Sequence, residues 1–380
     1  MEDGDVGEER RRRPTMTDVA RLAGVSQSSV SLVLNNMTGA RISEATRRRV
    51  WDAVRRIGYQ FEPRRREPLP ATGAAAKNLI GYLVDEISTS PHPVQSVDGA
   101  RDAAWEHECV LAVFATRGNP EQEAATIRAL LANPGLVGIV YSTIFTRKVT
   151  LPPLLDGVPT VLLNCLAEDR RFPSVVPGEV AGGHTATERL IQAGHTRIGF
   201  INGEPWMDAA RDRLKGYRQA LATADLPFDP RLVRHGEWAP SSGYAQTLSL
   251  MREPRPPTAI FCANDLMAVG CLEALRGLGL RVPEDIAVIG YDDQEIAQHT
   301  HPPLTTVLLP NYEMGRWAVE HLIATVIHGQ DARHLQVKME CPLVERASVG
   351  GPAVQERASG TGPAPEIIPT PKTLRETGYV

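Results

Sequence analysis

The sequence lacks any long apolar run. Its longest apolar segments, such as Leu136 to Tyr141, are far shorter than the roughly 20 residues that a membrane-spanning helix needs. The five cysteines are odd in number and form no CxxC pair, which disfavours a disulfide framework or a zinc site. The first 14 residues, MEDGDVGEERRRRP, contain no apolar segment and are not expected to be a secretory signal. These absences predict a soluble, cytoplasmic protein without a bound metal.

Motifs of cofactor-dependent and hydrolytic enzymes are also missing. No candidate strand is followed by GxGxxG or a P-loop, and the chain contains neither HExxH nor GxSxG. His299 and His301 stand without further clustered ligands, and such a pair belongs more often to a loop than to a metal site. We therefore expect no catalytic residue and no cofactor, and an enzyme with a Rossmann-type fold is kept only as an alternative.

The net charge of −4 conceals two regions of opposite sign. Between Arg10 and Arg66 there are 14 arginines and four acidic residues, whereas from Glu67 onward 36 acidic residues stand against 27 basic ones. A compact basic region attached to a larger acidic one favours nucleic acid as a partner. Charge alone would equally allow a solvated basic helix surface.

Residues 15–61 have the pattern of a small helical domain, preceded by a flexible arm over residues 1–14. We expect a first helix that is capped by Thr15 together with Asp18 and runs to Ala23, and a tight turn at Gly24. Ser26 is expected to cap a second helix that runs through Leu34. Ser43 is expected to cap a third helix that ends at Gly58. The apolar positions of these three helices would form a small core.

The second helix presents short, uncharged polar side chains: Gln27, Ser28, Ser29 and Ser31. Two short helices joined at a glycine match a helix-turn-helix, whose second helix enters the major groove of DNA. There Gln can contact adenine with two hydrogen bonds, and Ser can serve bases or phosphates. Together with the surrounding arginines, this face predicts double-stranded DNA as the partner.

The remaining chain alternates short apolar strands with helical stretches, after a proline-, alanine- and arginine-rich linker over residues 62–77. This alternation from 78 to 348 predicts parallel sheets covered on both faces, and its length predicts two lobes. The expected strands are 79–84, 110–115, 137–142, 160–164, 198–202, 259–263, 286–291 and 305–309. The expected helices include 122–131, 185–193, 211–222, 265–278 and 312–327. Residues 349–380 are Pro/Gly-rich and are expected to be a disordered tail.

The segments TDVARLAGVSQSSVSLVLN and ISEATRRRVWDAVRRIGY closely resemble the DNA-binding headpiece of the LacI–GalR family of bacterial transcription regulators. Five later segments resemble that family's landmarks in order: AGHTRIGFI, RLKGYRQAL, ANDLMAVGCLEAL, VPEDIAVIGYDD and PPLTTV. The resemblance implies an all-α helix-turn-helix headpiece, a hinge linker and a two-lobed, periplasmic-binding-protein-like α/β domain with Rossmann-like lobes. It also implies a homodimer that binds a palindromic operator, with affinity controlled by a small molecule in the cleft. No leucine heptad follows Ser348, so a dimer is favoured over a tetramer.

The resemblance places the expected DNA contacts in the headpiece and the hinge: Thr17, Gln27, Ser28, Ser29, Ser31, Leu32, Asn35, Arg41, Arg64, Arg65 and Leu69. Leu32 departs from the family, in which an arginine is common at this position, and predicts a contact with a thymine methyl group. The hinge departs as well. Leu69 lies between Pro68 and Pro70, which disfavours a helical Leu69. We expect this hinge to bind DNA as an extended basic strand.

Candidate effector ligands follow from the rule that two-lobed α/β domains bind at the carboxyl ends of their strands. Asn164, Asn264 and Asp292 each follow an expected strand. The resemblance adds Arg213, Trp238 and, in a segment where aromatic residues are common, His92. Amides, a carboxylate, an arginine and an indole suit a polyhydroxylated, carbohydrate-like effector.

Three of these residues also have a structural alternative. Asn264 and Asp292 could cap the helices that follow them, and Arg213 could pair with Asp208 or Asp212. A cytoplasmic solute-binding protein has the same fold. Whether the effector strengthens or weakens DNA binding stays open at this stage, as does the identity of the sugar.

Overall fold

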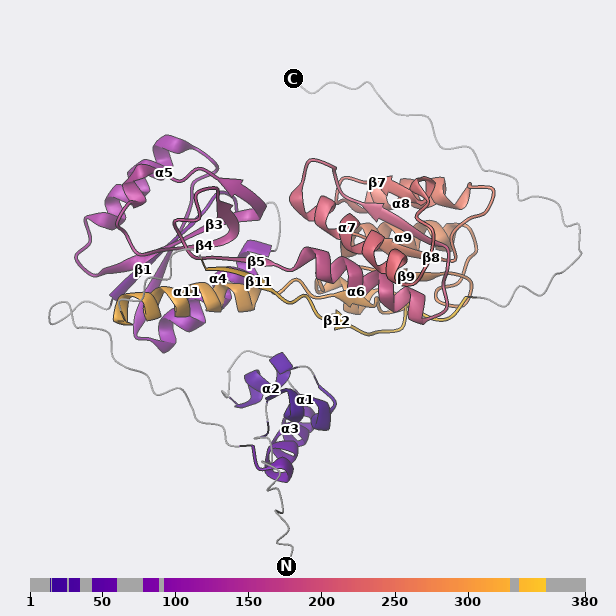
Figure 1. The fold of residues 1–380 in the computed structure, drawn as a ribbon, viewed down its shortest axis with the longest axis horizontal. Helices are drawn as coiled ribbons and strands as arrows, with labels where there is room; N and C mark the ends of the chain where they lie inside the picture. Colours follow the sequence, from indigo (N-terminus) through magenta and orange to yellow (C-terminus); the bar gives the residue numbers. More distant parts are fainter. Residues whose placement is uncertain are drawn as a thin grey trace, which may run out of the picture. The chain divides into compact units, whose positions relative to one another are not determined.

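The computed structural model describes Pro14 and residues 16–25, 27–34, 43–59, 78–88, 92–328 and 335–352 (Figure 1). The chain forms two compact units, Met1–Leu69 and Pro70–Val380. Among the described residues, no helix combines the length and the apolar character needed to cross a membrane.

The described residues of the first unit form three helices, α1 (Met16–Ala23), α2 (Gln27–Leu34) and α3 (Glu44–Ile57). Gly24 adopts a φ of +63° between α1 and α2, which a residue with a side chain rarely does. The Ser43 hydroxyl accepts the Thr46 N–H, and Gly58 ends α3 in the left-handed conformation, so both expected caps of this helix are confirmed. The caps expected at Thr15 and Ser26 lie outside the described residues.

These helices enclose a core of small and β-branched side chains: Val19, Ala20, Ala23, Val30, Val33, Leu34, Val50, Ala53 and Val54. Three of them, Val30, Val33 and Leu34, come from α2. The apolar face of α2 therefore packs into the core, where α1 and α3 hold the helix in place.

The second unit has two lobes, each built on a parallel sheet. Lobe 1 contains six strands in the order β11-β5-β4-β3-β1-β2. Helices α4 (His92–Glu106) and α11 (Asn311–His328) cover one face of this sheet, and α5 (Pro120–Leu131) covers the other (Figure 1). The strands are β1 (Asn78–Val84), β2 (Cys109–Ala115), β3 (Leu136–Val149), β4 (Thr160–Ala167), β5 (Ser174–Pro177) and β11 (Gln336–Met339).

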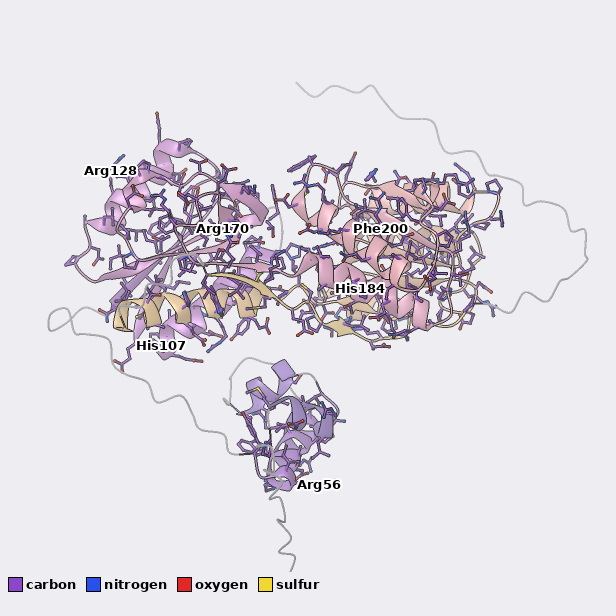
Figure 2. All side chains as sticks on the ribbon, viewed as in Figure 1. Arg56, His107, Arg128, Arg170, His184 and Phe200 are labelled. Atoms are coloured by element: carbon purple, nitrogen blue, oxygen red, sulfur yellow. The ribbon has the colours of Figure 1, made fainter. Side chains whose placement is uncertain are left out.

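Lobe 2 contains four parallel strands in the order β7-β6-β8-β9. They are β6 (Ile198–Asn202), β7 (Val233–His235), β8 (Ala259–Cys262) and β9 (Ala287–Ile289). The covering helices are α6 (Glu179–Gln192), α7 (Asp208–Thr223), α8 (Pro240–Met251), α9 (Asp265–Gly277) and α10 (Ile296–His299). A short antiparallel pair, β10 (Thr306–Val307) with β12 (Leu343–Val344), completes the lobe. Phe200 lies in its interior, stacked on Phe261 at 4.5 Å between ring centroids (Figure 2).

The chain passes between the two lobes three times: from β5 to α6, from β10 to α11, and from β11 to β12. The expected parallel sheets and two lobes are thus confirmed, with different boundaries for some strands. The strand expected at 137–142 continues to Val149, and the one expected at 305–309 is reduced to two residues. The tail was expected from residue 349, but Val349 packs against the core of lobe 2, so the packed chain continues past Ser348.

Candidate effector site and DNA-binding helix

A cleft of about 610 Å³ lies in the second unit and is lined by side chains from both lobes. All six residues expected at an effector site line this cleft: His92, Asn164, Arg213, Trp238, Asn264 and Asp292. They come from elements that are far apart in the sequence. The folding of the two lobes brings them together.

Arg213 is the most constrained of these residues, with only 3% of its surface exposed. Its Nε and Nη2 atoms donate to the two carboxylate oxygens of Glu179 at 2.7 and 2.9 Å, and Nη1 donates to the Ala263 carbonyl. The guanidinium lies 3.7 Å from the ring centroid of Tyr291, and its Nη2 lies 3.5 Å from Asp292 Oδ1. Burial alone would lower the pKa of Arg213, but the carboxylates of Glu179 and Asp292 outweigh it and raise that pKa.

The alternative in which Arg213 pairs with Asp208 or Asp212 is wrong. Asp208 pairs with Arg211, three residues along α7 and on the same face. Positions one and five residues before Arg213 do not share its face, so neither aspartate reaches it. The partner is Glu179 on α6, which the sequence analysis missed.

The approach of α6 to α7 explains this pairing. A Cβ added at Gly216 would lie 2.2 Å from the Val180 carbonyl oxygen, and one at Gly183 would lie 2.5 Å from the Arg213 carbonyl oxygen. Only glycine allows the two backbones to come this close. Gly216, one turn after Arg213, therefore lets α7 seat this arginine against the start of α6.

Asp292 is buried and adopts a φ of +103° at the carboxyl end of the sheet in lobe 2. Its Oδ2 accepts a hydrogen bond from Gln294 at 3.3 Å and lies 3.4 Å from His92 Nε2 of lobe 1. Its Oδ1 has no hydrogen-bond partner among the described residues. The alternative role as a helix cap is wrong for Asp292, because Glu295 occupies the N-cap position of α10.

Asn264 does cap a helix, as its alternative role predicted. Its Oδ1 accepts the Met267 N–H at 2.8 Å at the start of α9, and its Nδ2 donates to the Trp238 carbonyl at 3.0 Å. Trp238 itself has a φ of +60° and its indole lies directly over Gly203, where an added Cβ would meet the ring at 1.9 Å. Asn264 therefore holds the aromatic residue in the cleft.

Asn164 has a similar positioning role in lobe 1. At a φ of +59° it follows the central part of β4, and its Nδ2 donates to the Thr143 carbonyl at 3.0 Å. Its Oδ1 accepts from the Thr146 hydroxyl at 2.6 Å. The amide thus ties β4 to the part of β3 that extends past residue 142, and this extension forms one wall of the cleft.

The cleft also contains residues that the sequence analysis did not select. Asp85 and Glu86 follow β1, so the rule of strand ends could have found them. Asp85 accepts the Ile144 N–H at 2.8 Å and pairs with Arg147 at 2.8 Å. Hydrogen bonds from Ser88 and Ile87 lower the pKa of Glu86 to about 2, so this carboxylate is ionised at neutral pH. Glu204 follows β6 in the same way, whereas Phe145 and Trp206 also line the cleft and had no recognisable signal in the sequence.

The expected DNA-binding residues are divided between described and undescribed parts of the chain. Thr17 lies in α1, and α2 carries five of them: Gln27, Ser28, Ser29, Ser31 and Leu32. The others lie outside the described residues: Asn35, Arg41, Arg64, Arg65 and Leu69. Helix α3 adds four exposed arginines, of which Figure 2 labels the last: Arg48, Arg49, Arg55 and Arg56. The first unit thus combines a helix-turn-helix with a basic surface, as DNA-binding proteins do.

A helix-turn-helix unit followed by a two-lobed α/β domain with a polar cleft defines a class of transcription regulators that respond to small molecules. Residues 15–61 match the family of bacterial regulatory proteins called the lacI family, and residues 187–349 match the periplasmic binding protein-like domain. Among curated proteins, the regulator CelR of Thermobifida fusca is 34% identical over 90% of this chain and 99% of its own length. The repressor PurR of Aliivibrio fischeri is 32% identical over 88% of this chain and 98% of its own. The chain belongs to the lacI family and is a DNA-binding transcriptional regulator, not an enzyme.

Solved structures agree with this assignment. A complex of the regulator CelR with cellobiose has a TM-score of 0.61 and 33% identity, covering 88% of this chain and all of the other. The lac repressor dimer bound to its operator and an anti-inducer has a TM-score of 0.62 and 27% identity, covering 90% of this chain and all of the other. Both alignments therefore extend over the headpiece and the two-lobed domain.

Proposed function

We propose that this protein represses transcription in the cytoplasm as a homodimer on a palindromic operator, and that a polyhydroxylated effector in the cleft controls its operator affinity. The relative PurR, matched over 98% of its length, is named a repressor, and the relative CelR, named a regulator, was solved with cellobiose. In the headpiece, Gln27, Ser28 and Ser31 of α2 contact bases or phosphates, and Leu32 contacts a thymine methyl group. The hinge residues Arg64, Arg65 and Leu69 also contact the operator.

The observation that carries the effector class is a pair of buried oxygens in the cleft. Asp292 Oδ1 and Glu204 Oε2 have no hydrogen-bond partner among the described residues. Leaving a buried carboxylate oxygen unpaired is costly, so groups of this kind are expected to find a partner. Hydroxyl groups of a sugar donate hydrogen bonds and suit both acceptors, and the indole of Trp238 suits the apolar face of a sugar ring. Arg213 completes the site and orients Asp292.

The DNA-binding half of the proposal is tested by selecting binding sites from random duplex DNA at one stated salt concentration. We expect a palindrome with two half-sites. Gln27→Ala is expected to relax the preference at one base position in each half-site, at a cost of about 1–3 kcal/mol. An unchanged base preference in this variant would remove Gln27 from sequence readout, and sequence-independent binding by the wild type would refute an operator-specific role.

A further inference from the structure

A second aromatic surface lines the cleft next to Trp238. Phe145 comes from β3 of lobe 1, and Trp206 comes from the turn between β6 and α7 of lobe 2. Their ring centroids are 5.7 Å apart with an interplanar angle of 74°. Trp206 is nevertheless 61% exposed, so most of its indole faces water. A large aromatic surface left exposed at a cleft suits the apolar face of a ligand.

The turn that carries Trp206 is braced by hydrogen bonds. The Asn202 side chain accepts the Gly203 N–H at 2.9 Å, and the Met207 N–H donates to the Glu204 carbonyl at 3.1 Å. Arg211 donates to the Trp206 carbonyl at 2.5 Å. The indole is therefore presented by a fixed backbone, which lowers the entropy that binding would cost.

Phe145 is supported from its own lobe. The Arg147 guanidinium lies 5.4 Å from the centroid of its ring and is itself held by the Asp85 carboxylate. The same carboxylate accepts the N–H of Ile144, the residue before Phe145. Each lobe thus contributes one aromatic ring whose neighbours are fixed independently of the other lobe.

The two aromatic surfaces of the cleft are adjacent. The indole N–H of Trp238 donates to the Met207 sulfur at 2.9 Å, and Met207 directly follows Trp206. One sugar ring placed on Trp238, near Arg213 and Asp292, would leave the pair of Phe145 and Trp206 uncovered. The cleft volume of about 610 Å³ is well above the roughly 300 Å³ at which ligand pockets begin.

The charges of the cleft disfavour an anionic ligand. Five carboxylates line it, against three arginines. Arg147 and Arg213 are already paired with Asp85 and Glu179. A sugar phosphate would bring negative charge beside surplus carboxylates, whereas a neutral sugar would not.

We propose that Phe145 and Trp206 form an outer subsite that holds the second ring of a neutral oligosaccharide, while Trp238, Arg213 and Asp292 hold the first ring. This inference rests on the proposed carbohydrate effector and narrows it to ligands of two or more rings. An alternative role for the aromatic pair is a contact that only joins the lobes. That role would affect ligands of every length equally.

The test is calorimetry on the full-length protein with matched sugars: glucose with cellobiose and maltose, xylose with xylobiose, and mannose with β-1,4-mannobiose. The wild type is expected to bind one disaccharide at least tenfold more tightly than the matching monosaccharide. Trp206→Ala is expected to weaken disaccharide binding about tenfold and to leave the monosaccharide within twofold. Trp206→Phe should retain most of the disaccharide affinity. Trp51→Ala, which removes a 37%-exposed tryptophan from the headpiece, is the control and should change neither.

The possible failures are distinguishable. Equal losses for monosaccharide and disaccharide in Trp206→Ala would assign the pair to lobe contact and overturn the outer subsite, while the carbohydrate site itself would stand. Equal wild-type affinities for monosaccharide and disaccharide would also overturn the outer subsite and leave the carbohydrate site standing. Binding of none of these sugars would overturn the outer subsite and the carbohydrate class of the proposed function together.

Discussion

At the scale of single residues, the cleft is organised around one buried cation with two carboxylates. Arg213 satisfies Glu179 through two hydrogen bonds and approaches Asp292 without bonding its Oδ1. The surplus negative charge therefore stays on Asp292, which faces the cleft. This arrangement both holds α6 against α7 and leaves one acceptor for a ligand.

Removing the charge of Arg213 should destabilise the folded protein. Arg213→Met leaves Glu179 and Asp292 buried without their counter-ion, so we expect a loss of about 3–5 kcal/mol in the free energy of unfolding. The measurement is urea unfolding of the full chain at pH 7. Arg211→Met is the matched control, because it breaks the exposed pair with Asp208 on the same helix and should cost under about 1 kcal/mol. Similar losses in both variants would mean that Arg213 is not a buried structural charge.

The sequence predicts which residues line the cleft where their position relative to a strand is enough to place them. Asn264 and Asp292 follow β8 and β9, so the geometry of parallel sheets alone predicts that they lie at the cleft. Asn164 was expected to end its strand, but it lies within β4, at the point where the register between β3 and β4 shifts. Glu179 also follows a strand, β5, but this four-residue strand was not among the expected ones. Glu179 reaches Arg213 only because Gly183 and Gly216 let two helices touch, and this is a property of packing that the sequence pattern does not encode.

At the scale of elements, periodicity predicted the helices of the headpiece and the central strands of both sheets. Boundaries were less predictable where tertiary contacts set them. The extension of β3 to Val149 depends on a hydrogen bond that Asn164 donates to the Thr143 carbonyl and on one that Asp85 accepts from the Ile144 N–H, and both residues lie far away in the sequence. A tertiary contact also sets the boundary at the end of the second unit, because a buried histidine, His195, holds the Gly350 carbonyl against lobe 2.

This histidine, His195, makes the stability of lobe 2 depend on pH. His195 is 1% exposed, its Nδ1 lies 2.9 Å from the Thr258 hydroxyl, and its Nε2 lies 2.7 Å from the Gly350 carbonyl oxygen. Burial lowers the pKa of His195 below its ordinary value of 6.5. Below pH 6.5 the unfolded chain therefore binds the proton more readily than the folded chain. Stability is lost as the pH falls through that window towards the lower, folded-state pKa.

We expect His195→Gln to remove this part of the pH dependence, which amounts to at most about 1.4 kcal/mol per pH unit for one proton. The measurement is urea unfolding between pH 8 and pH 5. The variant is expected to be less stable than the wild type at pH 8, with a flatter decline towards pH 5. His299→Gln, at an exposed histidine of the same lobe, should leave the slope unchanged. A wild-type slope retained in His195→Gln would assign the pH dependence to other groups.

At the scale of the whole molecule, alternating strands and helices over some 270 residues predicted two lobes, and the resemblance predicted their connection to a headpiece. What no local pattern predicts is which side chains meet between the lobes. His92 lies 3.4 Å from Asp292, and Phe145 packs on Trp206, so two contacts between the lobes adjoin the same cleft. A ligand that favours one arrangement of the lobes must alter these contacts, and its effect on DNA binding cannot exceed its difference in affinity for the two arrangements.

Thermodynamic linkage between sugar binding and operator binding gives the last prediction. If a sugar changes operator affinity by some factor, then the operator must change sugar affinity by the same factor, and for couplings of 1–3 kcal/mol this is about 5–150-fold. Operator binding is measured by fluorescence anisotropy with and without saturating sugar, and sugar binding by calorimetry with and without operator, at one salt concentration. Asp292→Asn keeps the shape of the site but loses the carboxylate that receives the sugar, so its operator affinity should stay at the sugar-free value. Unequal factors in the wild type would show that a third process, such as dissociation of the dimer, accompanies binding. Equal factors that differ from one would establish that cleft and headpiece are energetically coupled, and their direction would show whether the sugar weakens or strengthens operator binding.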